Sequence, residues 1–252
     1  NGTSGYEEAA GQGLVAGVNA ALKVDGEEPL ILGRDESYIG VLIDDLVTKG
    51  TTEPYRMFTS RAEHRLVLRE DNTVERLSKV ATRLGLLDDA YKVRLEKILD
   101  KRESLTNFLT TTKIGPSVTN LNKLNEIRTK PINKQNSLAD LLKRSEVSYQ
   151  DLEIFGADVS IHDEIFEPVE VSIKYSGYIK RQNELIGIAK KLEGMKIPVN
   201  LDYKSIRGLS NEEVEKLSRV KPLSIGQAQR MSGVNPSAIQ SILVYLKLHK
   251  AS

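Results

Sequence analysis

The first twenty residues constrain the fold most, because they join a glycine-rich loop to a helix with an unusual number of small side chains. Residues 1–5 form the loop, and residues 6–20 have helical spacing. The small residues recur at intervals of three and four, which places them on one helix face: Ala9, Gly13, Ala16, Gly17 and Ala20. Such a face permits close approach to a sheet or cofactor, and the loop can present backbone N–H groups at the positive end of the helix dipole. Because each helical glycine costs up to about 1 kcal/mol relative to alanine, either tight helix packing or a ligand site explains the pattern.

A second informative stretch, residues 55–69, is rich in arginine and aromatic residues. Its interleaved members are Tyr55, Arg56, Phe58, Arg61, Arg65 and Arg69. A guanidinium group binds phosphate through two hydrogen bonds and stacks on bases, so the mixture suits RNA. Internal salt bridges explain the arginines equally well, because acidic residues lie nearby in nearly matching number: Glu53, Glu63, Glu70 and Asp71. Alternation of side chains from residue 63 onward predicts a short β segment near residues 55–70.

Elsewhere the apolar spacing is helical, so the predicted fold class is mainly α. The expected helices cover residues 38–47, 72–84, 88–108, 117–128, 138–142, 149–155, 168–192, 209–220, 224–231 and 237–249. The last three helices form a small bundle with a helix-turn-helix arrangement. Its third helix lacks the arginine-rich face that reads DNA, so protein docking or tRNA backbone binding fits better.

The adjacent carboxylates Asp44 and Asp45 invite an acid–base hypothesis. Neighbouring helix residues do not face each other, however, so we expect a solvated edge or an arginine partner instead.

Charge and composition narrow the function classes. The net charge is +1, so any nucleic-acid surface must come from local clustering. The absence of cysteine excludes disulfides and cysteine chemistry within these residues, and the three histidines lack metal-ligand spacing. No apolar run reaches the roughly 18 residues that a membrane helix needs. We therefore expect a cytoplasmic protein without a metal site.

Three strings of this sequence resemble the glucose-inhibited-division (GidA/MnmG) family, flavoproteins that modify the wobble uridine of tRNA. Residues 1–20 resemble the family's second signature. Residues 53–63 are similar to its Glu-Pro-Tyr-Arg-Met-Phe-Thr-Ser-Arg-Ala-Glu core, although the family often has tyrosine where this chain has His64. Residues 224–239 resemble its terminal segment.

The resemblance implies the C-terminal part of an enzyme that uses FAD, NADH and methylenetetrahydrofolate. With a GTPase partner, MnmE/TrmE, that enzyme adds a carboxymethylaminomethyl or aminomethyl group at carbon 5 of the wobble uridine. The implied organisation is a remnant of an FAD-binding α/β domain with its closing helix and an arginine-rich linker in residues 1–70. A helical domain in 71–204 and a partner-docking subdomain in 205–252 follow.

The resemblance also implies roles for individual residues. The expected FAD contacts are Asn1, Gly2, Thr3, Ser4, Gly5, Tyr6 and Glu7. The expected tRNA contacts are Arg56, Arg61, Arg65 and Arg69. The expected GTPase contacts are Glu212, Ser224, Ile225, Gln227, Arg230, Ile239 and Leu243. We expect no catalytic residue in this chain, no activity of the chain alone, a homodimer in the full-length protein, and neither membrane nor DNA binding. The alternative is a stand-alone adaptor that binds RNA or protein.

Overall fold

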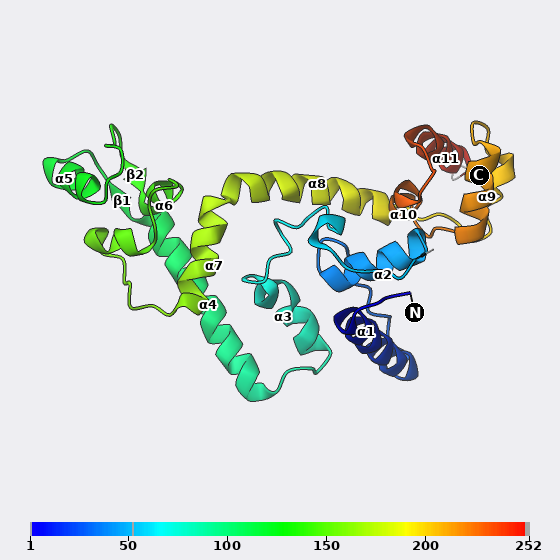
Figure 1. Ribbon diagram of the computed structural model, residues 1–252, viewed down its shortest axis with the longest axis horizontal. Coiled ribbons are helices and arrows are strands. Elements are labelled where there is room, and N and C mark those ends of the chain that lie inside the picture. The colour runs from blue at the N-terminus through cyan, green and yellow to red at the C-terminus, as the bar shows by residue number, and fades with distance from the viewer. Residues whose placement is uncertain (1, 52, 250–252) are drawn as a thin grey trace. The chain divides into compact units, whose positions relative to one another are not determined.

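The computed structural model describes residues 2–51 and 53–249, and these are mainly helical, as the sequence predicted (Figure 1). The chain divides into two compact units. Unit 1 combines Asn1–Leu68 with Gln182–Ser252, and unit 2 is Arg69–Arg181. The predicted division at residues 70 and 204 stays a prediction.

Unit 2 is built around the long helix α4 (Asp89–Thr111), which packs against α6 (Leu138–Leu142) and α7 (Asp163–Lys174). Its other elements are α3 (Thr73–Arg83), β1 (Lys113–Ile114), α5 (Val118–Glu126), β2 (Asn136–Ser137) and the 3-10 helix η2 (Gln150–Phe155). Strands β1 and β2 pair antiparallel, with Lys113 opposite Ser137. Figure 1 shows β1, β2, α5 and α6 gathered near the end of α4.

A continuous apolar core holds unit 2 together. Its fully buried members include Leu109, Leu124, Leu141, Leu142 and Tyr149, whose ring stacks on Phe166 with centroids 4.9 Å apart. Burying each such side chain contributes about 1.5–3 kcal/mol, so this core accounts for the packing of α4, α6 and α7.

The predicted start of the helix at Pro168 is wrong, because Pro168 lies inside α7. The helix begins at Asp163, where the His162 ring nitrogen Nδ1 accepts the amide of Glu164 at 3.2 Å. A proline has no N–H, so the carbonyl of Glu164, four residues earlier, lacks its helical donor. The buried guanidinium of Arg102 replaces that donor, with Nε and Nη2 at 3.1 and 2.6 Å from the carbonyl oxygen.

The predicted single helix over residues 168–192 is also interrupted. Tyr175, with φ −95° and ψ 8°, ends α7, and α8 (Ser176–Gly194) begins directly after it. The boundary between the two units falls within α8. Apolar spacing continues across the break, and this is why periodicity alone could not detect it.

The first part of unit 1 is α1 (Tyr6–Val24) packed against α2 (Tyr38–Thr48). Helix α2 lies where the sequence predicted and begins with a cap, in which the Ser37 hydroxyl accepts the Gly40 amide at 2.9 Å. A methyl group at Gly40 would lie 2.3 Å from the Gly33 carbonyl oxygen. The loop before α2 therefore packs closely only because position 40 is glycine.

The predicted β strand within residues 55–70 is wrong. Residues 63–67 instead form consecutive turns, in which the amides of Val67 and Leu68 both donate to the His64 carbonyl, at 2.8 and 3.1 Å. A strand needs a partner for its backbone groups, and the turns satisfy these groups locally.

The second part of unit 1 is a small helical bundle, as predicted. It comprises the 3-10 helix η3 (Tyr203–Ser205), α9 (Asn211–Val220), α10 (Ile225–Arg230) and α11 (Pro236–His249). A capping box between Ser210 and Glu213 starts α9. The bundle core contains Ile197, Tyr203, Ile206, Leu217, Ile225, Ala228, Met231, Ile239 and Ile242. Across the described ranges, no helix combines the length and the apolarity needed to cross a lipid bilayer.

Candidate functional site

The N-terminal loop and the arginine-rich segment lie side by side in unit 1. Thr3 and Tyr55 form a parallel bridge, in which the Tyr55 amide donates to the Gly2 carbonyl at 2.5 Å. The Ser4 amide donates to the Tyr55 carbonyl at 2.9 Å. These bonds join two segments that lie 51 residues apart in sequence.

Glu8, in the first turn of α1, fixes the next residues of the arginine-rich segment. It is only 8% exposed, and its Oε1 accepts the Met57 amide at 3.0 Å and pairs with Arg56 Nε at 3.5 Å. The Met57 amide is the main cause that lowers the pKa of Glu8. A methyl group at Gly5 would lie 1.7 Å from Glu8 Oε2, so a larger side chain at position 5 would displace the Glu8 carboxylate.

A hollow of about 350 Å³ lies between α1, α2 and this segment. Its walls are Glu7, Glu8, Gly11, Tyr38, Ile39, Leu42, Arg56 and Met57. The buried Glu8 Oε2 has no hydrogen-bond partner among the described residues. Apolar walls with a few convergent polar groups are typical of small-molecule sites.

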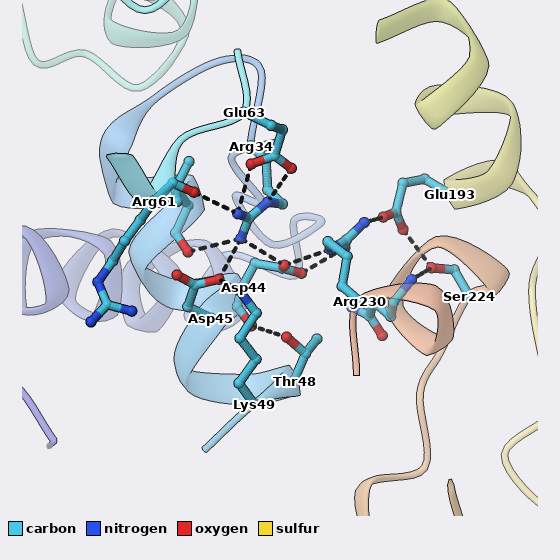
Figure 2. Close-up of polar contacts among 12 residues, drawn as sticks. Arg34, Asp44, Asp45, Thr48, Lys49, Arg61, Glu63, Glu193, Ser224 and Arg230 are labelled. Carbon is cyan, nitrogen blue, oxygen red and sulfur yellow. Dashed lines mark hydrogen bonds and ion pairs between the residues drawn. The ribbon is translucent and has the colours of Figure 1, made fainter. Parts of the chain in front are cut away.

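Arg34, in the loop before α2, is the centre of a network of buried charges (Figure 2). Its Nη1 donates to Asp44 at 3.0 Å and to Asp45 at 2.8 Å. Its Nε and Nη2 each donate to an oxygen of Glu63 at 2.8 Å, and Nη2 also donates to the Arg61 carbonyl at 3.2 Å. Arg34 therefore fixes residues 61–63 against α2. The expected arginine partner for Asp44 and Asp45 is confirmed.

Asp45 is only 1% exposed, and its neighbours keep its carboxyl group ionised. Burial raises its pKa, but hydrogen bonds from Lys49, Tyr55 and Arg34 outweigh burial and hold the pKa below its usual value. The Tyr55 hydroxyl donates to Asp45 Oδ2 at 2.8 Å. Burial, followed by this carboxylate, raises the pKa of Tyr55, which keeps the phenol protonated.

Arg230, at the end of α10, connects the C-terminal bundle to α2 (Figure 2). Its Nε and Nη2 each donate to an oxygen of Asp44 at 2.8 Å. Arg230 also pairs with Glu193, which accepts the Ser224 hydroxyl. Asp44 thus receives both Arg34 and Arg230, and α2 with the preceding loop connects the string at 224–239 to the one at 53–63.

The structure places the four predicted tRNA-binding arginines differently. Arg56 is half-exposed and pairs with Glu8, and the exposed Arg61 guanidinium lies 4.4 Å from the centre of the Tyr55 ring. Arg65 is exposed, and its side chain has no hydrogen bond or ion pair with any described residue. In unit 2, Arg69 pairs with Asp71 through two bonds of 2.8 and 2.9 Å. The salt-bridge alternative therefore applies to Arg56 and Arg69 but not to Arg65.

The predicted FAD contacts lie at the start of α1, apart from Asn1, which is outside the described residues. Gly2, Thr3 and Ser4 form the bridge with Tyr55, and Gly5 precedes the first turn. Tyr6 is 94% exposed, and Glu7 is exposed beside the hollow.

The small-residue face of α1 is exposed at most of its positions. Ala9, Gly13, Ala16, Gly17 and Ala20 are all exposed, and a methyl group at Gly13 or Gly17 would meet nothing within 4 Å.

Most of the predicted GTPase contacts serve the bundle itself. Ser224 caps α10, Ile225 and Ile239 are core residues, and Gln227 accepts the Leu223 amide at 2.8 Å. Arg230 belongs to the Asp44 network described above. Glu212 is exposed and pairs with Lys216, and Leu243 is half-buried.

Comparison with known proteins points to one family. Three family models match: "tRNA modifying enzyme MnmG/GidA C-terminal helical bundle" over residues 186–252, "tRNA modifying enzyme MnmG/GidA C-terminal helical domain" over 89–183, and "Glucose inhibited division protein A" over 1–28. The chain belongs to the MnmG/GidA family. The helical-domain match from residue 89 to residue 183 covers most of unit 2, and the helical-bundle match lies within unit 1.

Individual MnmG/GidA relatives agree. The tRNA uridine 5-carboxymethylaminomethyl modification enzyme MnmG of Bdellovibrio bacteriovorus is 54% identical over 99% of this chain and 39% of that protein. The enzyme of the same name from Listeria welshimeri is 50% identical over 99% of this chain and 40% of that protein. Aquifex aeolicus GidA, in its form II crystal, superposes with a TM-score of 0.81 at 45% identity, covering 97% of this chain and 38% of that one. The chain thus spans about two-fifths of the length of these relatives.

Sequence reasoning missed Arg34 and Glu8. Gly33-Arg34-Asp35 reads as a polar break between elements, and Glu8 reads as one of several acidic residues near a helix start. A usable signal existed for Glu8, because a glutamate three residues after a cap position can turn back toward the helix start. Arg34 has no comparable local signal, because its partners lie 10, 11 and 29 residues away.

Proposed function

We propose that this chain supplies binding surfaces for an FAD-dependent enzyme that adds a carboxymethylaminomethyl or aminomethyl group at carbon 5 of the tRNA wobble uridine. The supporting observation is that unit 1 joins the glycine loop, the arginine-rich segment and α10 through Tyr55, Asp45, Asp44 and Arg230. The relatives' names supply the reaction. We propose that the chain contributes no catalytic residue and is inactive alone.

The residues at the start of α1 fit a flavin. The hollow offers apolar walls, and Glu8 Oε2 is a buried acceptor without a donor among the described residues. A flavin ring carries apolar edges as well as an N–H group that can donate. FAD, when bound, supplies two-electron redox chemistry. In this proposal the loop at residues 2–5 and the first turn of α1 border the flavin, and Glu8 holds Arg56 and Met57 beside it.

The arginines of unit 1 form the proposed tRNA surface. Arg65 is free to bind phosphate, and Arg61, stacked on Tyr55, presents a planar cation next to an aromatic ring. Arg56 takes part only by exchanging its carboxylate partner for phosphate, and the same holds for Arg69 in unit 2. Arg65 therefore carries the largest share of the proposed affinity.

We propose that the C-terminal bundle docks the GTPase partner through its exposed side chains, supported from beneath by the buried Ile225 and Ile239. Exposed apolar residues of the bundle are Leu223, Val244 and Leu248. The full-length assembly in this proposal is a cytoplasmic homodimer that uses NADH and methylenetetrahydrofolate.

The test is tRNA binding measured by fluorescence anisotropy across a salt series, with Arg65→Gln as the variant. We expect weaker binding and a salt slope lower by about 1, because one phosphate contact is lost. The matched control is Lys216→Gln, which removes the same charge from a lysine paired with Glu212. An unchanged slope for Arg65→Gln would remove this residue from the tRNA surface.

A further inference from the structure

Unit 2 carries a concentrated positive charge around the segment from β1 to α6. Residues 113–144 contain seven basic and two acidic side chains, although the whole chain is nearly neutral. Three of the basic side chains stabilise the fold. Lys123 donates to the Ile154 carbonyl, and Lys143 pairs with Asp140. Arg144 donates to the Lys130 carbonyl and the Thr129 hydroxyl. The other four form what we call the unit 2 basic patch: Lys113, Arg128, Lys130 and Lys134.

The four cations of the patch stabilise no other part of the chain that the structure describes. All are exposed, and none of their side chains has a hydrogen bond or ion pair with a described residue. The acidic residues nearby do not neutralise them. Asp140 pairs with Lys143 and caps α6, and Glu146 accepts the Thr129 hydroxyl at 2.8 Å. The exposed Glu126 forms no ion pair with the four cations among the described residues. A net positive field therefore remains at this surface.

Buried groups fix the shape of the loop that carries the patch. Thr129 is 7% exposed and Ile132 is 6% exposed, and both point into unit 2. Arg144 Nη1 donates to the Thr129 hydroxyl at 2.9 Å and to the Lys130 carbonyl at 2.5 Å. Arg128 adopts a left-handed backbone conformation, with φ at 55°. The loop is thus held by Arg144 and by the buried Thr129 and Ile132, and its own cations are available to a ligand.

We propose that the unit 2 basic patch binds the phosphate backbone of tRNA, as a second contact in addition to the arginines of unit 1. This inference rests on the proposed function. Cations interleaved with amide side chains are typical of phosphate and sugar contacts, and Asn133, Gln135 and Asn136 lie among these cations. A membrane surface fits less well, because the large apolar side chain of the loop, Ile132, is buried.

The decisive variant is Arg128→Asn/Lys130→Gln/Lys134→Gln in the whole chain. Asparagine tolerates the left-handed conformation at position 128, so the backbone is preserved. With an unmodified tRNA transcript as the probe, we expect the salt slope to fall by about 2 and the affinity near physiological salt to fall about tenfold or more. The matched control is Lys92→Gln/Lys143→Gln/Lys216→Gln, which removes the same charge from lysines that already have acidic partners.

The outcomes separate this inference from the proposed function. If the unaltered chain does not bind the transcript, both fail. If Arg65→Gln lowers the slope but the patch variant behaves like its control, only the second contact is overturned. Loss of binding to phosphatidylserine vesicles with unchanged tRNA binding would assign the patch to a lipid surface and would also overturn it. Circular dichroism of each variant confirms that the fold is intact.

Discussion

Unit 2 and the first part of unit 1 are held together by different kinds of interaction. In unit 2, a continuous apolar core fills the space between α4, α6 and α7. Beside α2 in unit 1, the buried apolar cluster comprises Val41, Ala62 and Leu68. The ion pairs of Arg34 with Asp44 and with the buried Asp45 lie there as well.

This difference determines how each region responds to substitution of its buried residues. An apolar core accepts many side chains of similar volume, because its attraction has no direction. A buried ion network is stable only when every charge keeps its partner, and loss of one partner leaves the others uncompensated. The segments that carry the proposed flavin and tRNA contacts are therefore positioned by directional bonds.

The largest expected effect comes from Arg34→Met. The variant leaves Asp44 and Asp45 with one cation fewer, which should cost about 3–5 kcal/mol. Hydrogen exchange should show faster exchange of the α2 amides and unchanged protection of α6. Leu141→Ala, which opens a cavity in unit 2 at about 2–5 kcal/mol, should give the opposite pattern. If Arg34→Met increased amide exchange equally in α2 and α6, the contrast between the two regions would be wrong.

An intermediate effect should depend on pH and should appear in Asp45→Asn. The folded pKa of Asp45 is lowered, so its stabilisation is present above the unfolded value of about 3.9 and is lost as the pH falls through the folded pKa. Urea unfolding followed by circular dichroism should show the variant less stable by about 1–3 kcal/mol at neutral pH. The difference should shrink as the pH falls below that value. A constant difference at all pH values would mean that packing, not charge, explains the effect.

The smallest effect should appear in a double-mutant cycle of Arg102 and Pro168 in unit 2. Pro168→Ala supplies an amide for the Glu164 carbonyl, so Arg102→Met should cost less in that background. We expect a coupling of about 1 kcal/mol between the two positions. Arg102 also binds Glu75 at 2.9 Å, so part of the cost remains in both backgrounds. Strict additivity in thermal unfolding would show that Arg102 does not replace the missing donor.

The sequence predicted the features that local chemistry determines. The cap residues Ser137 and Ser210 predicted the starts of α6 and α9, and apolar spacing predicted most of the other helices. The strand near residues 55–70 was wrong because alternation describes burial and cannot reveal whether a partner strand exists. Pro168 was placed at a helix start because proline is common there. The replacement of its missing donor by Arg102, 66 positions earlier, is a tertiary contact.

The candidate site was predictable in part for the same reason. Its segments could be recognised, but the bonds that join them could not. Asp44 binds Arg230, which lies 186 residues later in the chain, and no local sequence pattern predicts such a pairing.

The order of residues in unit 1 has a consequence for synthesis on the ribosome. Residues 1–68 emerge before unit 2, and Asp44 meets Arg230 only after another 186 residues have been added. At typical translation rates this interval is roughly 10–40 s. Unit 2, which is one continuous stretch, emerges during the wait and can fold first. Until then Arg34 is the one cation of this network that Asp44 can bind, and a chaperone that shields α2 would act in that period.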